Sequence, residues 1–87
     1  MEQEAVGQIR LFGGDFAPRN WAFCEGQPTP ISRYPVLYSL IGTAYGGDGI
    51  QYFALPDLRG KGPKSATNAK GYLRYIICID GEYISRP

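Results

Sequence analysis

The sequence predicts a small α+β domain made of short antiparallel strands, one helix of roughly three turns and a C-terminal β-hairpin. Three observations support this fold class. Several short segments carry the alternating or β-branched pattern of strands. Residues 32–41 alone combine helical spacing with a capping serine and a closing glycine. A chain of 87 residues has room for one domain only.

Two strands are expected near the N-terminus. Residues 8–12 alternate polar and apolar side chains and stop at a pair of glycines, as in a half-buried strand ended by a turn. A second strand begins near Trp21, after a proline-containing turn in which Asn20 can adopt the left-handed conformation. Trp21, expected in the core, then shares one face with Phe23, and Cys24 lies on the other.

The predicted helix covers residues 32–41. Ser32 can cap its first turn, and Gly42 can close its last turn. Pro35 falls in the first turn, where its missing N–H has no intrahelical partner to lose. The apolar side expected to pack on the sheet consists of Val36, Leu37, Leu40 and Ile41.

Two turn regions follow the helix, one rich in glycine and one built on Pro-Asp. The aspartates are expected to bond their own backbone. Asp57 and Arg59, two positions apart, would point the same way in an extended segment, where they could hold the turn by a local ion pair or bond backbone carbonyls. The residues assigned structural roles in these turns are Gly46, Gly47, Asp48, Gly49, Pro56, Asp57 and Arg59.

The C-terminal segment is the most strand-like part of the chain. Residues 72–79 are rich in β-branched and aromatic side chains, and the Asp80-Gly81 turn that follows predicts a hairpin with residues 82–85. The whole chain is predicted to be one domain with an N-terminal arm (1–6), a central motif region (7–60), a surface loop (61–71) and the terminal hairpin (72–87).

The side chains available do not suit catalysis or metal binding. The chain contains no histidine, so Cys24 has no imidazole base and no Ser-His-Asp arrangement is available. The two cysteines are too few for a zinc site. The glycine-rich turn lacks the Gly-Lys-Ser/Thr of a phosphate-binding loop. We therefore expect a protein that is not an enzyme and has no cofactor and no metal, although Asp48 and Asp57 leave a calcium or acid–base role as the less favoured alternative.

Charge and hydropathy limit the partners. A net charge of +1 argues against nucleic acid and leaves little repulsion between copies. No apolar run reaches the roughly 18–20 residues of a membrane span. The start of the chain is acidic where a signal peptide would be basic, so export without one is expected. Cys24 and Cys78 lie in apolar strand-like runs, which favours buried free thiols over a disulfide and leaves partner chains to complete so small a core.

Several segments, taken in their order along the chain, together resemble the phage tail collar domain, which also occurs in bacterial proteins called microcystin-dependent proteins. The matching segments are residues 7–14 (GQIRLFGG), 16–18 (FAP), 21–27 (WAFCEGQ), 31–32 (IS), 37–42 (LYSLIG), 45–49 (YGGDG) and 53–60 (FALPDLRG). The resemblance implies a small mixed fold found in tail fibres and other virion or extracellular appendages, often as trimers, without known catalysis. Longer members carry a glycine-rich, histidine-containing region after the last segment, which in some fibres binds the receptor. Residues 61–71 replace that region here, so the resemblance implies a scaffold.

Two functional hypotheses follow. The first is a structural subunit that joins identical copies into a trimer or filament, through strand addition by residues 72–85 or 1–8 and through aromatic contacts. The assigned interface residues are Tyr72, Tyr75, Ile77, Ile79, Tyr83, Tyr38 and Tyr45. The alternative is a module that binds a surface glycan on an aromatic platform made of Trp21, Tyr34, Tyr38, Tyr45 and Tyr52.

Overall fold

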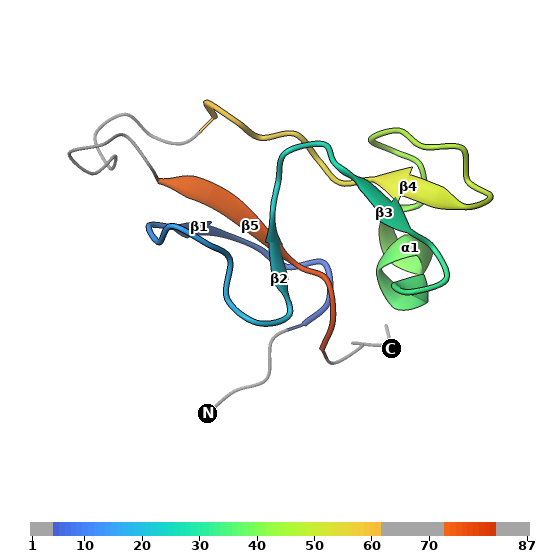
Figure 1. Cartoon of the computed structure of the whole chain (residues 1–87), viewed down its shortest axis with the longest axis horizontal. Coiled ribbons are helices and arrows are strands. Elements are labelled where there is room, and N and C mark those ends of the chain that lie inside the picture. The colour runs from blue at the N-terminus through green and yellow to red at the C-terminus, as the bar shows by residue number, and fades with distance from the viewer. Residues whose placement is uncertain (1–4, 62–72, 82–87) are drawn as a thin grey trace.

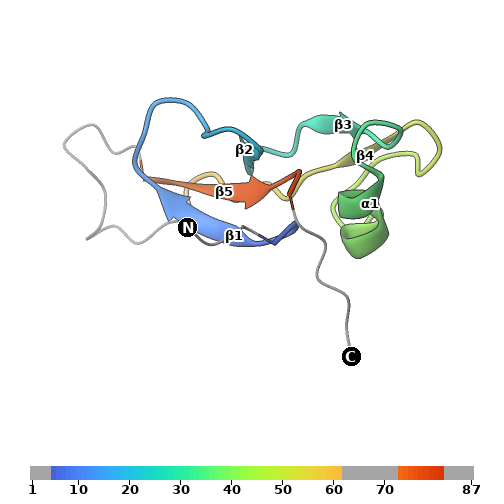
Figure 2. The same ribbon diagram turned by 90° about the horizontal axis from the view of Figure 1, so that it is seen from below.

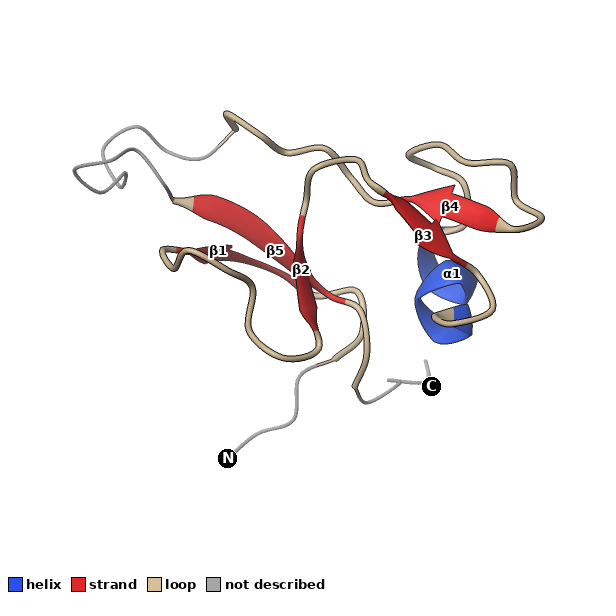
Figure 3. Cartoon of the chain, in the orientation of Figure 1, coloured by secondary structure: helices blue, strands red, loops and turns tan. Residues whose placement is uncertain are grey.

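Two small antiparallel sheets and a short helix form the fold of residues 5–61 and 73–81, the part of the chain that the computed structural model describes (Figures 1 and 3). In chain order the elements are β1 (Ile9–Phe12), β2 (Trp21–Phe23), β3 (Pro28–Pro30), α1 (Pro35–Ile41), β4 (Tyr52–Ala54) and β5 (Arg74–Cys78). The predicted α+β class is confirmed for these residues.

The larger sheet places the C-terminal strand in the middle. Its three strands run in the order β1-β5-β2, and both neighbours are antiparallel to β5. Ile77 lies opposite Ile9 on one side and opposite Ala22 on the other. Strand β5 is shorter than the predicted 72–79, and the predicted return strand of the hairpin, 82–85, lies outside the described residues.

The smaller sheet pairs β3 with β4, and α1 lies beside it at the other end of the molecule (Figures 1 and 2). Thr29 is opposite Phe53 and Pro30 is opposite Tyr52. Thr29 and Phe53 are buried, whereas Pro30 and Tyr52 are exposed. The alternation of a strand therefore turns one face of this sheet toward the core and the other toward solvent.

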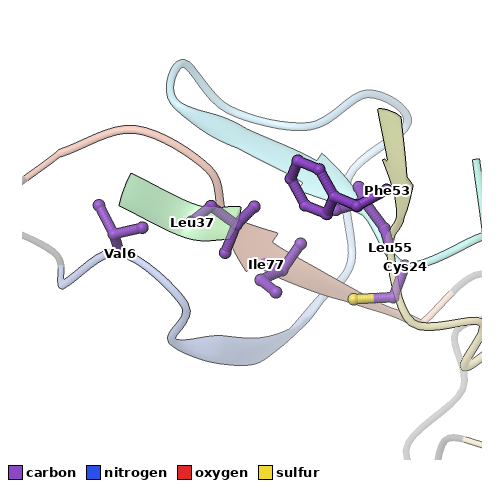
Figure 4. Packing of buried hydrophobic residues seen from close by; sticks show 6 residues of the cluster. All are labelled: Val6, Cys24, Leu37, Phe53, Leu55 and Ile77. Atoms are coloured by element: carbon purple, nitrogen blue, oxygen red, sulfur yellow. The ribbon is translucent and has the colours of Figure 1, made fainter. Parts of the chain in front are cut away.

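One core joins the two sheets and the helix (Figure 4). Its buried members are Val6, Cys24, Leu37, Phe53, Leu55 and Ile77. They come from residues next to β1 and β2, from α1, from β4 and the residue after it, and from β5. Because no single sheet provides more than a part of this cluster, neither sheet would retain its core alone.

The helix is shorter than predicted. It has 7 residues and begins after Tyr34, which lies at the N-cap with φ −129° and makes no side-chain capping bond. Proline disfavours the helical conformation of the residue before it, so Pro35 keeps Tyr34 out of the helix and leaves Ser32 too far upstream to cap it. The predicted end is confirmed, because the Gly42 N–H donates to the Tyr38 carbonyl over 2.8 Å.

The buried side of α1 also differs from the prediction. Leu37 is fully buried, but Val36 and Leu40 are 38% and 46% exposed. The side chains that pack on the core are Tyr34, Leu37, Tyr38 and Ile41. This set has the 3–4 spacing of one helix face. Leu37 and Ile41 are thus confirmed, whereas Val36 and Leu40 were predicted wrongly. The prediction counted only aliphatic residues, but Tyr34 and Tyr38 pack on the core instead.

Strand alternation separates the two cysteines. Cys78 pairs with Trp21, and Cys24 lies three residues after Trp21, so the two thiols lie on opposite faces of the sheet. Both are buried and free, as the sequence favoured. Burial raises the pKa of the Cys24 thiol to about 11, so it is neutral near pH 7. Trp21 is half-buried on the face away from the core, so its predicted core position is wrong.

The glycine-rich turn lies directly against β4. The Asp48 Oδ1 accepts bonds from the backbone N–H groups of Ile50 (2.8 Å), Gln51 (2.9 Å) and Tyr52 (3.1 Å). These bonds, with that of Ile50 first, lower the pKa of Asp48. Gly47 has φ 106°, and a Cβ atom on it would lie 2.5 Å from the Phe53 Cα. The close backbone approach therefore requires glycine at position 47.

The helix face is tested by replacing two leucines of the same helix. Leu37→Ala removes a fully buried side chain from the core and should lower the free energy of unfolding by about 2–5 kcal/mol. Leu40→Ala, on the half-exposed side, should cost about 1 kcal/mol or less. Urea unfolding followed by circular dichroism measures both, and equal losses would contradict the assigned face.

The turn packing is tested with two glycines of positive φ. Gly47→Ala should be strongly destabilising, because its methyl group overlaps backbone atoms that cannot rotate away. Gly60 has φ 74° with nothing within 4 Å of a Cβ, so Gly60→Ala should cost only the left-handed strain, about 1–2 kcal/mol. A thermal midpoint that falls equally in both variants would show that the close approach at Gly47 does not matter.

Candidate assembly surface

Large apolar side chains remain exposed on several elements of the described chain. They are Ile9, Leu11, Phe16, Val36, Leu40, Tyr45, Ile50 and Tyr52. Single exposed apolar residues are ordinary, but so many on a chain of 87 residues leave the small core with apolar surface that a partner could cover.

The assigned interface residues lie in different surroundings. Ile77 is 1% exposed at the centre of the core, so we leave it out of the interface. Tyr38, Tyr75 and Ile79 pack on the core and are partly buried. Tyr45 is the most accessible of the described set, at 52% exposed. Tyr72 and Tyr83 lie outside the described residues.

The central position of β5 changes the predicted mode of strand addition. Residues 74–78 already pair with β1 on one side and with β2 on the other. To join a neighbouring copy, β5 would have to leave its own sheet and expose Ile77. The described part of the predicted donor segment is therefore an internal strand, and strand addition would have to use an edge that remains open.

The outer edge of β2 is closed by local bonds. The Trp21 N–H donates to the Pro18 carbonyl over 3.0 Å, in the predicted turn where Asn20 has φ 71°. The Phe23 carbonyl accepts the Gln27 side-chain amide over 2.8 Å and also the Glu25 N–H over 3.1 Å. A new strand would have to displace these bonds.

Both edges of the smaller sheet are also closed. Thr29 and Phe53 bond to each other across the sheet, so the backbone groups at the neighbouring positions of β3 point outward. These positions are Pro28 and Pro30, which have no N–H. On the β4 side, the Ala54 N–H donates to the Gly46 carbonyl over 3.0 Å. Prolines and the glycine-rich turn thus protect this sheet from edge pairing.

The outer edge of β1 is open. The Cys24 N–H donates to the Tyr75 carbonyl, so the odd-numbered residues of β5 bond to β2. The backbone groups of successive residues point to opposite sides of a strand, so the even-numbered residues of β5 bond to β1. The β1 partners of the odd-numbered residues, Ile9 and Leu11, therefore direct their N–H and C=O groups away from the sheet. No described residue bonds to them there.

The open edge of β1 was not predicted from the sequence. The signal was present, because the terminal segment is apolar at nearly every position, as a central strand is, whereas residues 8–12 include charged and polar residues, as an edge strand does. Ile9 and Leu11 are 40% and 36% exposed, so the same two residues present both free backbone groups and apolar side chains.

The proposed aromatic platform is not brought together. Trp21 lies on the outer face of the larger sheet, where the Arg10 guanidinium is 5.6 Å from its ring centre. Tyr34 and Tyr38 pack on the core. Tyr52 lines a shallow depression with Pro28, Thr29, Pro30 and Gln51. Among the five aromatic residues, Tyr45 and Tyr52 are the exposed ones.

The Leu-Pro-Asp-Leu segment connects the two sheets. Its backbone pairs with the segment after β2 through Leu55 N–H to Gln27 O (3.2 Å) and Leu58 N–H to Cys24 O (2.9 Å). Asp57, which follows the buried Pro56, forms a bidentate ion pair with Arg59: Nε donates to Oδ1 over 2.9 Å, and Nη2 donates to Oδ2 over 2.7 Å. The motif residues therefore serve internal contacts.

Two further features of the described residues concern metal-binding groups and membrane-spanning helices. Residues 5–61 and 73–81 contain no group of three His, Cys, Asp or Glu side chains placed to hold a metal ion. In the same part of the chain, no helix has the length and hydropathy that crossing a membrane requires.

The ion pair gives a prediction for acid pH. The Arg59 side chain, followed by its backbone N–H, lowers the pKa of Asp57 to about 2. A lowered carboxyl pKa stabilises the fold at pH values above its ordinary value of 3.8, and this contribution is lost as the pH falls toward 2. Asp57→Asn should therefore lose stability relative to wild type at pH 6, and the difference should shrink steadily between pH 4 and pH 2.

Two variants, one at Arg59 and one at Lys61, test what lowers the pKa of Asp57. Arg59→Gln should raise the pKa of Asp57, as followed by NMR titration of its carboxyl group. Lys61→Gln removes a charge of the same sign that acts only weakly on Asp57, and it should change the pKa little. Equal shifts in the two variants would mean that general charge, and not the hydrogen-bonded pair, holds the pKa down.

Comparisons with known proteins agree with this architecture. The family model of the Phage Tail Collar Domain matches residues 7–63. The short tail fiber protein gp12 of Enterobacteria phage T4 is 41% identical over 56 residues, which are 63% of this chain and 10% of that protein. The chain thus spans about a tenth of the length of this relative. The resemblance inferred from the motif segments is confirmed, and the chain belongs to the phage tail collar domain family.

Proposed function

We propose that this protein is a non-catalytic structural subunit of a phage tail fibre or a related appendage, in which identical copies assemble into a trimer or a filament. The location proposed is the virion tail or an extracellular appendage. The relative's name describes a tail fibre protein, and family membership extends that role to this chain as a proposal.

The observation that carries the proposal is the use made of the motif residues. Gly47, Asp48, Asp57 and Arg59 bond or pack within the chain. A motif used for internal bonding suits a rigid building block. The exposed apolar residues of β1 then offer surface for neighbours.

A second candidate function rests on Tyr45 and Tyr52, which are 52% and 41% exposed. Their accessible rings favour stacking against a sugar of a surface glycan. Fewer than half of the expected platform residues are accessible, so this role ranks below assembly.

The proposal predicts concentration-dependent assembly of the full chain. Light scattering after size-exclusion chromatography, with electron microscopy at high concentration, should show trimers or ordered filaments. A folded monomer at millimolar concentration would contradict the proposal. Glycan binding would replace assembly as the proposed function if that monomer bound a glycan on an array. Tyr52→Ala should then abolish the binding, whereas Phe16→Ala, at another exposed ring, should not.

A further inference from the structure

We infer that two copies of this chain join through β1, which pairs edge to edge and antiparallel with β1 of the second copy to make one six-stranded sheet. This inference rests on the proposed assembly function and specifies its contact. It concerns Ile9–Phe12 and the glycine that follows.

The state of the strand edges selects β1. Three edges in the described chain are closed by different means: local bonds at β2, prolines at β3 and the glycine-rich turn at β4. Natural proteins protect strand edges because an open edge pairs with other chains. The outer edge of β1 lacks these devices in the described chain, and its outward residues are both apolar.

A second copy is the occupant that matches this edge best. It offers an identical row of outward N–H and C=O groups, so one contact satisfies both open edges. The partner strand must also offer apolar side chains on one face to cover Ile9 and Leu11, and β1 itself does so.

The bulge at Gly7 limits the pairing register. Gly7 has φ 90°, its N–H donates to the Cys78 carbonyl over 2.8 Å, and the Cys78 N–H donates to Gln8 O over 2.9 Å. Glycine in this conformation with this pair of bonds forms a bulge. A register centred on Ile9 would place Leu11 opposite Gly7, whose N–H is already used, so the pairing cannot extend in that direction.

Side-chain charge excludes a second register. Centring the contact on Arg10 would place the two arginines directly opposite each other, and like charges in that position are unfavourable. Centring it on Leu11 pairs the two leucines, sets each Arg10 opposite Phe12 of the other copy and sets each Ile9 opposite Gly13. We therefore assign the register centred on Leu11.

This contact has a consequence for the assembly. A twofold edge contact joins copies in pairs and does not by itself close a trimer. Of the two proposed forms, it belongs to the filament, in which a second contact elsewhere on the chain links the pairs.

The pairing is tested by introducing proline at position 11, since prolines close the edge of β3. Leu11→Pro removes the outward N–H without removing a bond to β5, and it should weaken association at least about tenfold, while circular dichroism shows an unchanged fold. Leu11→Lys, which keeps the backbone and places like charges opposite each other, should act in the same direction. Val36→Lys is the matched control, because Val36 is 38% exposed and Leu11 is 36% exposed, and it should leave association unchanged.

The register is tested by disulfide trapping. Leu11→Cys should form a covalent dimer on mild oxidation, because the paired Cα atoms would be about 5.5 Å apart. Ile9→Cys should not, because the two residues would be offset by about 13 Å along the strands. The wild-type chain controls for Cys24 and Cys78, which are 3% and 0% exposed.

The outcomes separate this inference from the function on which it rests. Assembly lost in Leu11→Pro and Leu11→Lys but kept in Val36→Lys, with trapping through residue 11, supports it. Assembly that persists in both Leu11 variants, a threefold-symmetric trimer included, overturns the β1 contact and leaves the structural role standing. Trapping through residue 9 alone overturns the register. A monomeric wild-type chain overturns the function and this inference together.

Discussion

The fold depends on the enclosure of β5 between β1 and β2. Ile77 pairs with both neighbouring strands and is 1% exposed, so the same residue holds the sheet and fills the core. The flanking strands come from residues 9–23, whereas β5 comes from residues 74–78. The sheet can form only when these distant segments meet, and the entropy lost in closing so long a loop must be offset by burial of the core.

The segment that carries the family motif links this sheet to the rest of the molecule. Leu55 and Leu58 bond to the backbone after β2, while β4, just before them, pairs with β3. The Asp57 and Arg59 ion pair is exposed and lies next to these bonds, so its main effect is on the shape of the turn. A motif of this kind fixes the geometry between two sheets and leaves the outer surface free to vary.

The treatment of strand edges connects the fold with assembly. Backbone groups at an edge bond to the same chain, to water or to another chain, and the described elements direct three edges to the first of these. β1 differs, because no described residue bonds to the outward backbone groups of Ile9 and Leu11, and both side chains are partly exposed. The contrast between three closed edges and this one connects the fold with the proposed assembly.

Local chemistry determined much of this protein from the sequence alone. The left-handed Asn20 and the end of α1 at Gly42 follow from side-chain and backbone preferences that act within a few residues. The family was indicated by the order and spacing of the motif segments along the chain. The tertiary structure decided which strand is central, which face of α1 is buried and which edge stays open. Those choices depend on contacts between segments far apart in the chain, such as Ile77 with Ile9, and on whether tyrosine rings or aliphatic side chains fill the core.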